Sequence, residues 1–406
     1  MISLTRYRLL LGDPQLAGAF GASMAGRLPI GMAVLAILLF IQHTQQSFSA
    51  AGIAAALYVT GIGLVAPLIG RLIDRFGPRP VLLAGACTYP VALAGLMAAV
   101  KWEAGTAWIA VAALVAGIAL PPIPTCMRTL LRRLLHEPTQ VQAAYSLDSV
   151  LMETVFIVGP GIVSLFVAVG WPGGAVVCTA VCGGIGAVVF ARTRAVRNWH
   201  AERPIDGPRP RLLAAKGLAS IVAVTFLFSA GFGLFEVAVV AVATRAHVPA
   251  AAGLILALAS VGSAAGALVY GSRSWSLAPT GQYKAALLAM CLGLALLAPV
   301  RDLVLFGAIA IVAGVPMATV LAAQSVLIAG IAPRAALAEA FTWASTSLLA
   351  GVSVGIGLGG LLLEVATPML TLFGASLTTA AALATACLSV HSGRPGDGST
   401  PERLRS

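Results

Sequence analysis

Apolar residues fill the chain in long blocks, and short polar segments separate one block from the next. A helix needs roughly 20 apolar residues to cross the hydrocarbon of a bilayer. Windows of that length predict twelve membrane-spanning helices, so we expect an all-α membrane protein. The predicted spans are about 14–41, 49–72, 79–100, 105–131, 140–168, 172–191, 213–243, 248–271, 282–299, 302–329, 337–363 and 367–390.

A polar segment at about 192–212 divides the predicted spans into two sets of six. It holds three prolines and few apolar residues, which is typical of an exposed loop. We therefore expect an N-terminal half at 1–191, a linker at 192–212 and a C-terminal half at 213–391. The remaining tail, 392–406, is rich in Gly, Pro, Ser and charge, a composition that favours disorder.

Composition supports a membrane protein over a soluble one. The chain is 59% hydrophobic and 10% charged over 406 residues, with a mean hydropathy of +0.97, and a soluble domain carries far more charge. The net charge of +11 would suggest a nucleic-acid partner in a soluble protein, but here the basic residues gather in alternate loops. These include Arg71, Arg75, Arg79, Arg132, Arg133, Arg192, Arg194 and Arg197. This bias predicts a multi-pass protein of the cell membrane with both termini in the cytoplasm, and no nucleic-acid partner.

Several kinds of chemistry lack their sequence signals. The chain has three lysines, and none follows a Gly-rich phosphate loop. No H-E-x-x-H motif occurs, and all six cysteines fall inside predicted spans, where packing thiols are the simplest interpretation. We therefore expect neither an enzyme nor a cofactor or metal site, and any uphill transport would draw on an ion gradient.

The segment 70–79, between the second and third spans, is a charged tight turn that reads Gly-Arg-Leu-Ile-Asp-Arg-Phe-Gly-Pro-Arg. It resembles the G-x-L-x-D-R-x-G-R-R loop of the major facilitator superfamily. The matching residues are Gly70, Leu72, Asp74, Arg75, Gly77 and Arg79, and Pro78 replaces the first Arg of the final pair. The resemblance implies two six-helix halves that rock around a midplane cavity, usually in a monomer.

The same resemblance implies an inner latch built from charges near this loop. Arg128 ends the fourth predicted span and Asp148 starts the fifth, so we expect both to join Asp74 and Arg75. Asp74 is also expected to face the start of the span at 337–363, near 334–339, because a helix N-terminus favours an anion. Such a latch would hold the outward-open state and break when the cavity opens inward.

Ionisable residues inside predicted spans are few, and each costs roughly 2.5–3.5 kcal/mol at the bilayer centre on insertion scales. Arg27 and Glu153 lie midway along the first and fifth spans, at similar depth. One hypothesis is a charge pair whose carboxylate is protonated and released during transport. The alternative is a permanent structural pair that never titrates.

Glu236, in the seventh span, is a second candidate for proton exchange. Phe228, Phe232 and Phe235 share its helical neighbourhood, and a carboxylate in apolar surroundings can exchange protons near neutral pH. Glu236 is alternatively a partner for Arg27 or a rim residue that faces water.

Prolines interrupt backbone hydrogen bonding inside several predicted spans. They are Pro29, Pro121, Pro122, Pro124 and Pro316. Kinks at such positions suit helices that change shape during transport, and fixed bends are the alternative.

Gly159-Pro160-Gly161 resembles the start of the G-P-x-x-G-G motif of superfamily antiporters, although Val163 and Ser164 replace its last glycines. The stretches 148–160 and 339–343 also look like bacterial drug-efflux-like members. The resemblance implies proton-coupled efflux of a small amphipathic or hydrophobic compound, with the substrate, protons and the lipid bilayer as partners. An importer or facilitator of a small metabolite, and a non-transporting membrane sensor on the same fold, are the alternatives.

Overall fold

The structure is a computed structural model that describes residues 12–135, 138–199, 216–272, 275–331 and 337–389. In these ranges every regular element is a helix, and twelve helical segments are long and apolar enough to cross a membrane. The first half contains α2 (Pro14–Gln45), α3 (Phe48–Phe76), α4 (Pro78–Lys101), α5 (Thr106–Ile118), α6 (Ile123–Leu134), α7 (Pro138–Ala168), α8 (Pro172–Ala191) and α9 (Arg194–Arg197). The second contains α10 (Lys216–Arg245), α11 (Ala251–Ser272), α12 (Pro279–Leu297), α13 (Leu303–Ile331), α14 (Leu337–Val365) and α15 (Pro368–Ser389). The all-α membrane fold is confirmed.

Local signals explain where the helices begin and turn. Asp13 caps α2, because its Oδ1 accepts a hydrogen bond from the backbone N–H of Gln15 at 2.8 Å. Ser47 caps α3 in the same way, with Oγ accepting from the Ala50 N–H at 3.1 Å. Gly77 has φ +80° and is the joint between α3 and α4. A residue with a side chain is strained there, so the glycine is required by the turn.

The fourth predicted span is broken in two. Its residues form α5 and α6, and 119–122 between them are not helical. Pro121 and Pro122 have no backbone N–H to donate, so the helix cannot run through them. The proline pair therefore gives an interruption and not a simple kink.

The beginning of the predicted linker is not an exposed loop. Ala195 and Val196 of α9 are buried in a core cluster that includes Leu131 and Phe190, and the guanidinium of Arg133 lies 4.8 Å from the centre of the Trp199 ring. These contacts arise because α9 carries two apolar residues that fold back on the end of the first half. The rest of the linker and the tail lie outside the described residues.

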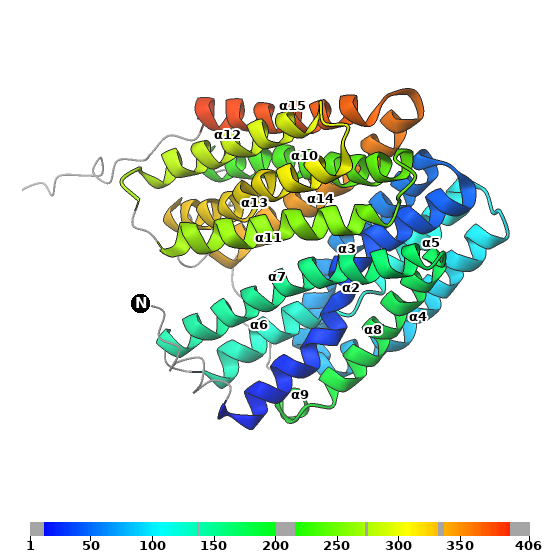
Figure 1. Cartoon of the computed structure of the whole chain (residues 1–406). Coiled ribbons are helices and arrows are strands. Elements are labelled where there is room, and N and C mark those ends of the chain that lie inside the picture. Colours follow the sequence, from blue (N-terminus) through cyan, green and yellow to red (C-terminus); the bar gives the residue numbers. More distant parts are fainter. Residues whose placement is uncertain (1–11, 136–137, 200–215, 273–274, 332–336, 390–406) are drawn as a thin grey trace, which may run out of the picture.

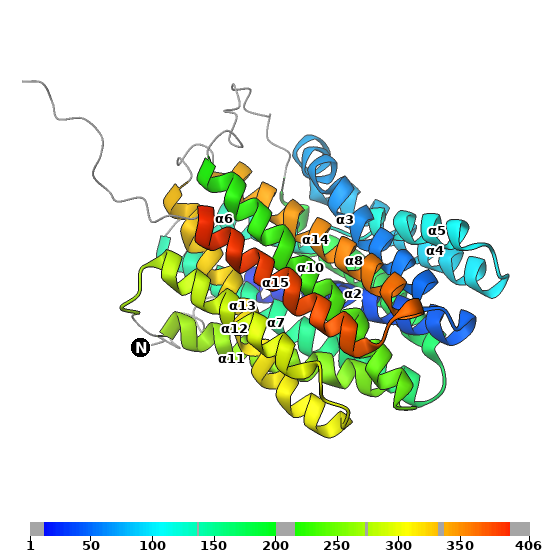
Figure 2. The same ribbon diagram turned by 90° about the horizontal axis from the view of Figure 1, so that it is seen from above.

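The two halves lie one above the other in Figure 1, with α2–α9 below and α10–α15 above. They meet along two helix pairs, α3 with α14 and α7 with α11, and Figure 2 shows α14 beside α3. In both pairs the backbones come close at glycines: a Cβ on Gly52 would lie 2.7 Å from Gly360 Cα, and one on Gly253 would collide with the Pro160 carbonyl oxygen. Small residues at these crossings let the halves approach without side chains between them.

Contacts between the halves gather at the end of the molecule where α3 begins and α14 ends, here named the seam end. Ser353 of α14 donates a hydrogen bond to the Ala56 carbonyl at 2.8 Å and lies 2.6 Å from the Thr60 hydroxyl. Toward the other end, named the basic end for the arginines around the α3–α4 turn, α7 and α11 diverge (Figure 1). The halves are therefore closed against each other at the seam end.

Candidate functional site

A cavity of about 240 Å³ lies between the two halves, at mid-length of the helices that surround it. Helices α2 and α7 supply its wall from the first half, and α10 to α14 supply its wall from the second. The lining includes Ile30, Val34, Glu153, Phe156, Pro160, Phe228, Ser229, Phe232, Phe235, Glu236, Ser260, Ser263, Met290, Met317 and Leu321. Its place at the interface means that any movement of one half against the other reshapes it.

Two carboxylates face this cavity, one from each half: Glu153 of α7 and Glu236 of α10. Both are partly exposed, and within the described residues neither accepts a hydrogen bond or forms an ion pair. No lysine, arginine or histidine is among the lining residues. A charge in such a place costs free energy unless a proton or a cation neutralises it. The cavity thus holds two acidic groups whose neutralising partners are not supplied by the described chain.

The rest of the wall is mainly apolar. Phe232 and Phe235 of α10 lie with ring centres 6.2 Å apart and planes tilted by 35°, and Met290 and Met317 face the cavity from α12 and α13. Aromatic rings give a large flat contact area, and methionine side chains adapt to different shapes. The wall therefore combines rigid aromatic rings with flexible methionine side chains.

Three serines are the remaining polar side chains of the wall, and their oxygens are engaged with backbone groups. Ser229 donates to the Phe226 carbonyl at 3.1 Å and Ser260 to the Leu256 carbonyl at 3.0 Å. Ser263 accepts from the Ala318 N–H at 3.2 Å. They offer little for recognition of a polar ligand. Among the described residues no cluster of three or more His, Cys, Asp or Glu side chains is arranged to hold a metal ion.

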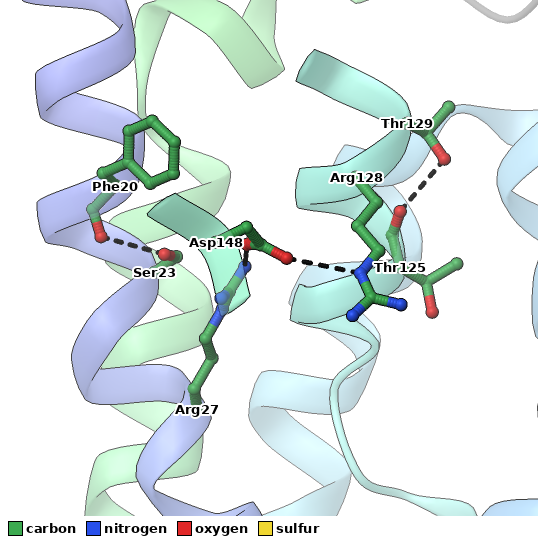
Figure 3. Close-up of polar contacts among 7 residues, drawn as sticks. All are labelled: Phe20, Ser23, Arg27, Thr125, Arg128, Thr129 and Asp148. Carbon is green, nitrogen blue, oxygen red and sulfur yellow. Dashed lines mark hydrogen bonds and ion pairs between the residues drawn. The ribbon is translucent and has the colours of Figure 1, made fainter. Parts of the chain in front are cut away.

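Arg27 does not line the cavity, and the expected pair with Glu153 is wrong. The Arg27 side chain is 0% exposed, and its Nη2 donates to Asp148 Oδ1 at 2.5 Å (Figure 3). Asp148 precedes Glu153 by five residues on α7, which places it about 7.5 Å nearer the basic end and on a different helix face. Arg27 therefore joins α2 to α7 on the basic-end side of the cavity, and Glu153 faces the cavity without an arginine partner among the described residues.

Asp148 is shared between two arginines. Its Oδ2 accepts from Nε of Arg128 on α6 at 3.3 Å (Figure 3), and its side chain is 1% exposed, against 61% for Arg128. Asp148 is the eleventh residue of α7, so it does not start the helix as the sequence suggested. The two other guanidinium nitrogens of Arg27, Nε and Nη1, have no hydrogen-bond partner within the described part of the chain. One carboxylate thus joins three helices of the first half.

The latch expected around the signature loop is described only in part. Arg75 lies with its guanidinium 5.1 Å from the centre of the Phe76 ring, Arg79 is exposed, and a Cβ on Gly70 would meet nothing within 4 Å. The side chain of Asp74 and the segment 334–339 that it was expected to face lie outside the described residues and side chains. The latch therefore stays a prediction.

Gly159 and Pro160, which match the start of the G-P-x-x-G-G motif, lie on α7 at its crossings with two other helices. A Cβ on Gly159 would lie 2.8 Å from the Gly31 carbonyl carbon, so the glycine allows α7 to cross α2 closely. Pro160 lines the cavity, and its carbonyl oxygen contacts Gly253 of α11. The motif thus positions α7 against one helix from each half, about two helical turns from Glu153.

One polar contact between the halves gave no clear signal in the sequence. Glu364, in the last turn of α14, accepts hydrogen bonds from Ser47 Oγ at 2.8 Å and from the Ser49 N–H at 2.9 Å. Ser47 stands before an apolar run, so it could have been found as a helix cap. Its partner lies 317 residues away, and no local pattern indicates it.

Comparisons with known proteins agree with this architecture. A profile of the Major Facilitator Superfamily matches residues 17–272, more than half of the chain. The crystal structure of a mutant of the nucleoside transporter NupG has a TM-score of 0.74 and 13% sequence identity, and the alignment covers 93% of this chain and 100% of that one. A comparison with curated proteins gave no match. With twelve spans in two halves around a shared cavity, the chain belongs to the Major Facilitator Superfamily and is a membrane transporter.

Proposed function

We propose that this transporter couples proton uptake to the efflux of a small amphipathic or hydrophobic compound. The observation that carries the proposal is the cavity between the halves, which has an apolar wall and two carboxylates without a cationic partner among its lining residues. The apolar wall supports binding of a compound with a large hydrophobic surface. The carboxylates support an exchange in which protons and substrate compete for the same acidic groups.

The pairing of Arg27 with Asp148 supports a role for Glu153 in this exchange. If Arg27 faced Glu153, the permanent positive charge would hold the carboxylate ionised and oppose protonation. Because Arg27 pairs with Asp148, it does not neutralise Glu153. A proton or a cationic substrate in the cavity would do so instead. Glu236 of α10 faces the same cavity from the second half. Each half therefore offers one acidic group to the same bound proton or substrate.

Alternating access fits the observed contacts between halves. The seam end is closed by α3 against α14, and the helix pairs cross at glycines, so the halves can rock about these crossings as rigid bodies. We place the basic end in the cytoplasm, in line with the positive-inside rule. A proton moving down a potential of 100 mV supplies about 2.3 kcal/mol, which permits modest uphill export without ATP.

The cavity offers less support for uptake of a polar metabolite. NupG is a nucleoside transporter, and at 13% identity the likeness shows a fold alone. A polar solute needs hydrogen-bonding groups to replace its water. Here Ser229, Ser260 and Ser263 are already bonded to backbone atoms. Import remains the alternative function, and a direct flux measurement separates the two.

The test is transport in proteoliposomes with an imposed pH gradient and a panel of lipophilic cations and neutral amphiphiles. Glu153→Gln and Glu236→Gln keep the shape of each side chain and remove its charge. Glu103→Gln, in the exposed turn between α4 and α5, is the matched control. We expect gradient-driven flux of at least one compound, a loss of tenfold or more in either cavity variant, and no change in the control. Wild-type flux that is indifferent to the pH gradient would overturn proton coupling, and substrate flux in the same direction as the proton flux would overturn efflux.

A further inference from the structure

At the seam end, a carboxylate from one half is bound to the start of a helix from the other. Glu364 of α14 accepts from Ser47 Oγ at 2.8 Å and from the Ser49 N–H at 2.9 Å, both at the N-terminus of α3. Arg245, at the end of α10, donates to the Ala366 carbonyl at 3.2 Å and so fixes the corner that follows α14. The Glu364 carboxylate thus joins the end of α14 to the start of α3 through one side-chain donor and one backbone donor.

The chemistry of this contact differs from that of the rest of the seam. The first N–H groups of a helix have no partner inside it, and their dipoles favour a negative charge. Hydrogen bonds to an ionised acceptor are stronger than neutral ones. Elsewhere in the described seam, the contacts are close glycine crossings such as Gly52 with Gly360 and neutral hydrogen bonds from Ser353. Glu364 therefore supplies a charged contact that holds the two halves together at this end.

We propose that Glu364 is a positioning residue of the transport cycle, a latch that holds the seam end closed until the halves rock apart. It does not line the central cavity, so it acts on the balance between conformations and not on substrate binding. Its side chain is exposed, and water competes for its hydrogen bonds, so the latch is weak enough to open in every cycle. This inference rests on the alternating-access part of the proposed function.

Acidic residues in the cavity and at the seam end should therefore affect transport in different ways. Removing the charge of Glu236 affects coupling in the cavity, whereas removing that of Glu364 changes how often the seam end opens. A weaker latch populates the state open at the seam end, and substrate binding from the basic end then falls by the fraction of molecules lost from the competent state. The apparent KM for loading at the basic end should therefore rise while proton coupling is retained.

The experiment measures opening directly, without a known substrate. Ala56 is 8% exposed and sits inside the closed seam, so an Ala56→Cys variant reports opening through labelling by a hydrophilic maleimide. Labelling of the purified full-length protein in detergent is counted above the background of the native cysteines, measured in the parent. We expect Glu364→Gln to raise the labelling rate about fivefold, the upper range for an exposed charged contact. Glu103→Gln, a carboxylate change at the same end, should leave the rate unchanged.

Two further variants keep the inference open to refutation. Ser47→Gly removes one donor while glycine still tolerates the cap position, so labelling should rise less than in Glu364→Gln. Gly52→Val is the positive control, because any side chain there meets the Gly360 backbone and forces the seam apart. If Gly52→Val raises labelling and Glu364→Gln does not, the assay detects separation of the seam and the latch is wrong, whereas the proposed function is unaffected. If neither variant raises labelling, opening at this end is itself wrong.

Discussion

The shared aspartate of the first half leads to an asymmetric prediction for three charge-removing variants. Asp148→Asn leaves Arg27, at 0% exposure, without an anion, and breaking a buried ion pair in this way costs about 3–5 kcal/mol. Arg27→Met leaves Asp148 beside Arg128 at 3.3 Å, so about 1–3 kcal/mol is expected, the cost of a lost buried hydrogen bond. Arg128→Gln removes a side chain that is 61% exposed, and about 0–1 kcal/mol follows.

Reversible unfolding in mixed micelles with a rising fraction of SDS measures these differences. The order of destabilisation should be Asp148→Asn, then Arg27→Met, then Arg128→Gln. The double variant Arg27→Met with Asp148→Asn should be more stable than Asp148→Asn alone, since it no longer buries an unpaired guanidinium. Two results would refute the shared-carboxylate account. One is an equal loss of unfolding free energy in Asp148→Asn and Arg27→Met, and the other is a loss in the double variant that equals the sum of these two.

Three other predictions test the seam, the cavity wall and a glycine crossing. A disulfide between Thr60→Cys and Ser353→Cys, whose native hydroxyl oxygens are 2.6 Å apart, should arrest transport until a reductant is added; full activity while cross-linked would contradict rocking at the seam end. Phe232→Ala removes an aromatic wall of the cavity and should raise the apparent KM for hydrophobic compounds about tenfold, and an unchanged KM would place the substrate elsewhere. Gly262→Leu drives a side chain into the α13 backbone and should lower the midpoint of thermal unfolding, whereas Gly95→Leu, with nothing within 4 Å of its Cβ position, should not; similar midpoints would refute the close crossing.

Hydropathy alone placed the spans within a few residues, for a physical reason. Backbone groups inside a bilayer must be satisfied within the segment, so a long apolar window has few options besides a helix. The window at 172–191 coincides with α8, and that at 79–100 differs from α4 by one residue at each end. Polar ends are harder: α2 continues to Gln45 beyond the predicted limit at 41, and α9 forms inside a stretch that reads as a loop.

The sequence predicted how far along their spans the ionisable residues lie, but not which residues form ion pairs. Sequence position put Arg27 and Glu153 midway along their spans and Glu236 in the outer half of its span, and the structure brings the two glutamates to one cavity. Sequence position does not give the rotation of α7 relative to α2. It therefore could not show that Arg27 faces Asp148 and not Glu153, five residues further along the same helix. Glu364 was missed for a related reason, since its donors belong to a distant helix end.

The measurement that tests the central claim most directly is proton release by purified protein when substrate binds. Lipophilic compounds are added to the weakly buffered wild type, Glu153→Gln, Glu236→Gln and the Glu103→Gln control, and released protons are followed with a pH indicator. The account predicts saturable release from the wild type and the control, and loss of release in at least one cavity variant. Saturable substrate binding with no proton release from the wild type, or with full release in both cavity variants, would contradict it.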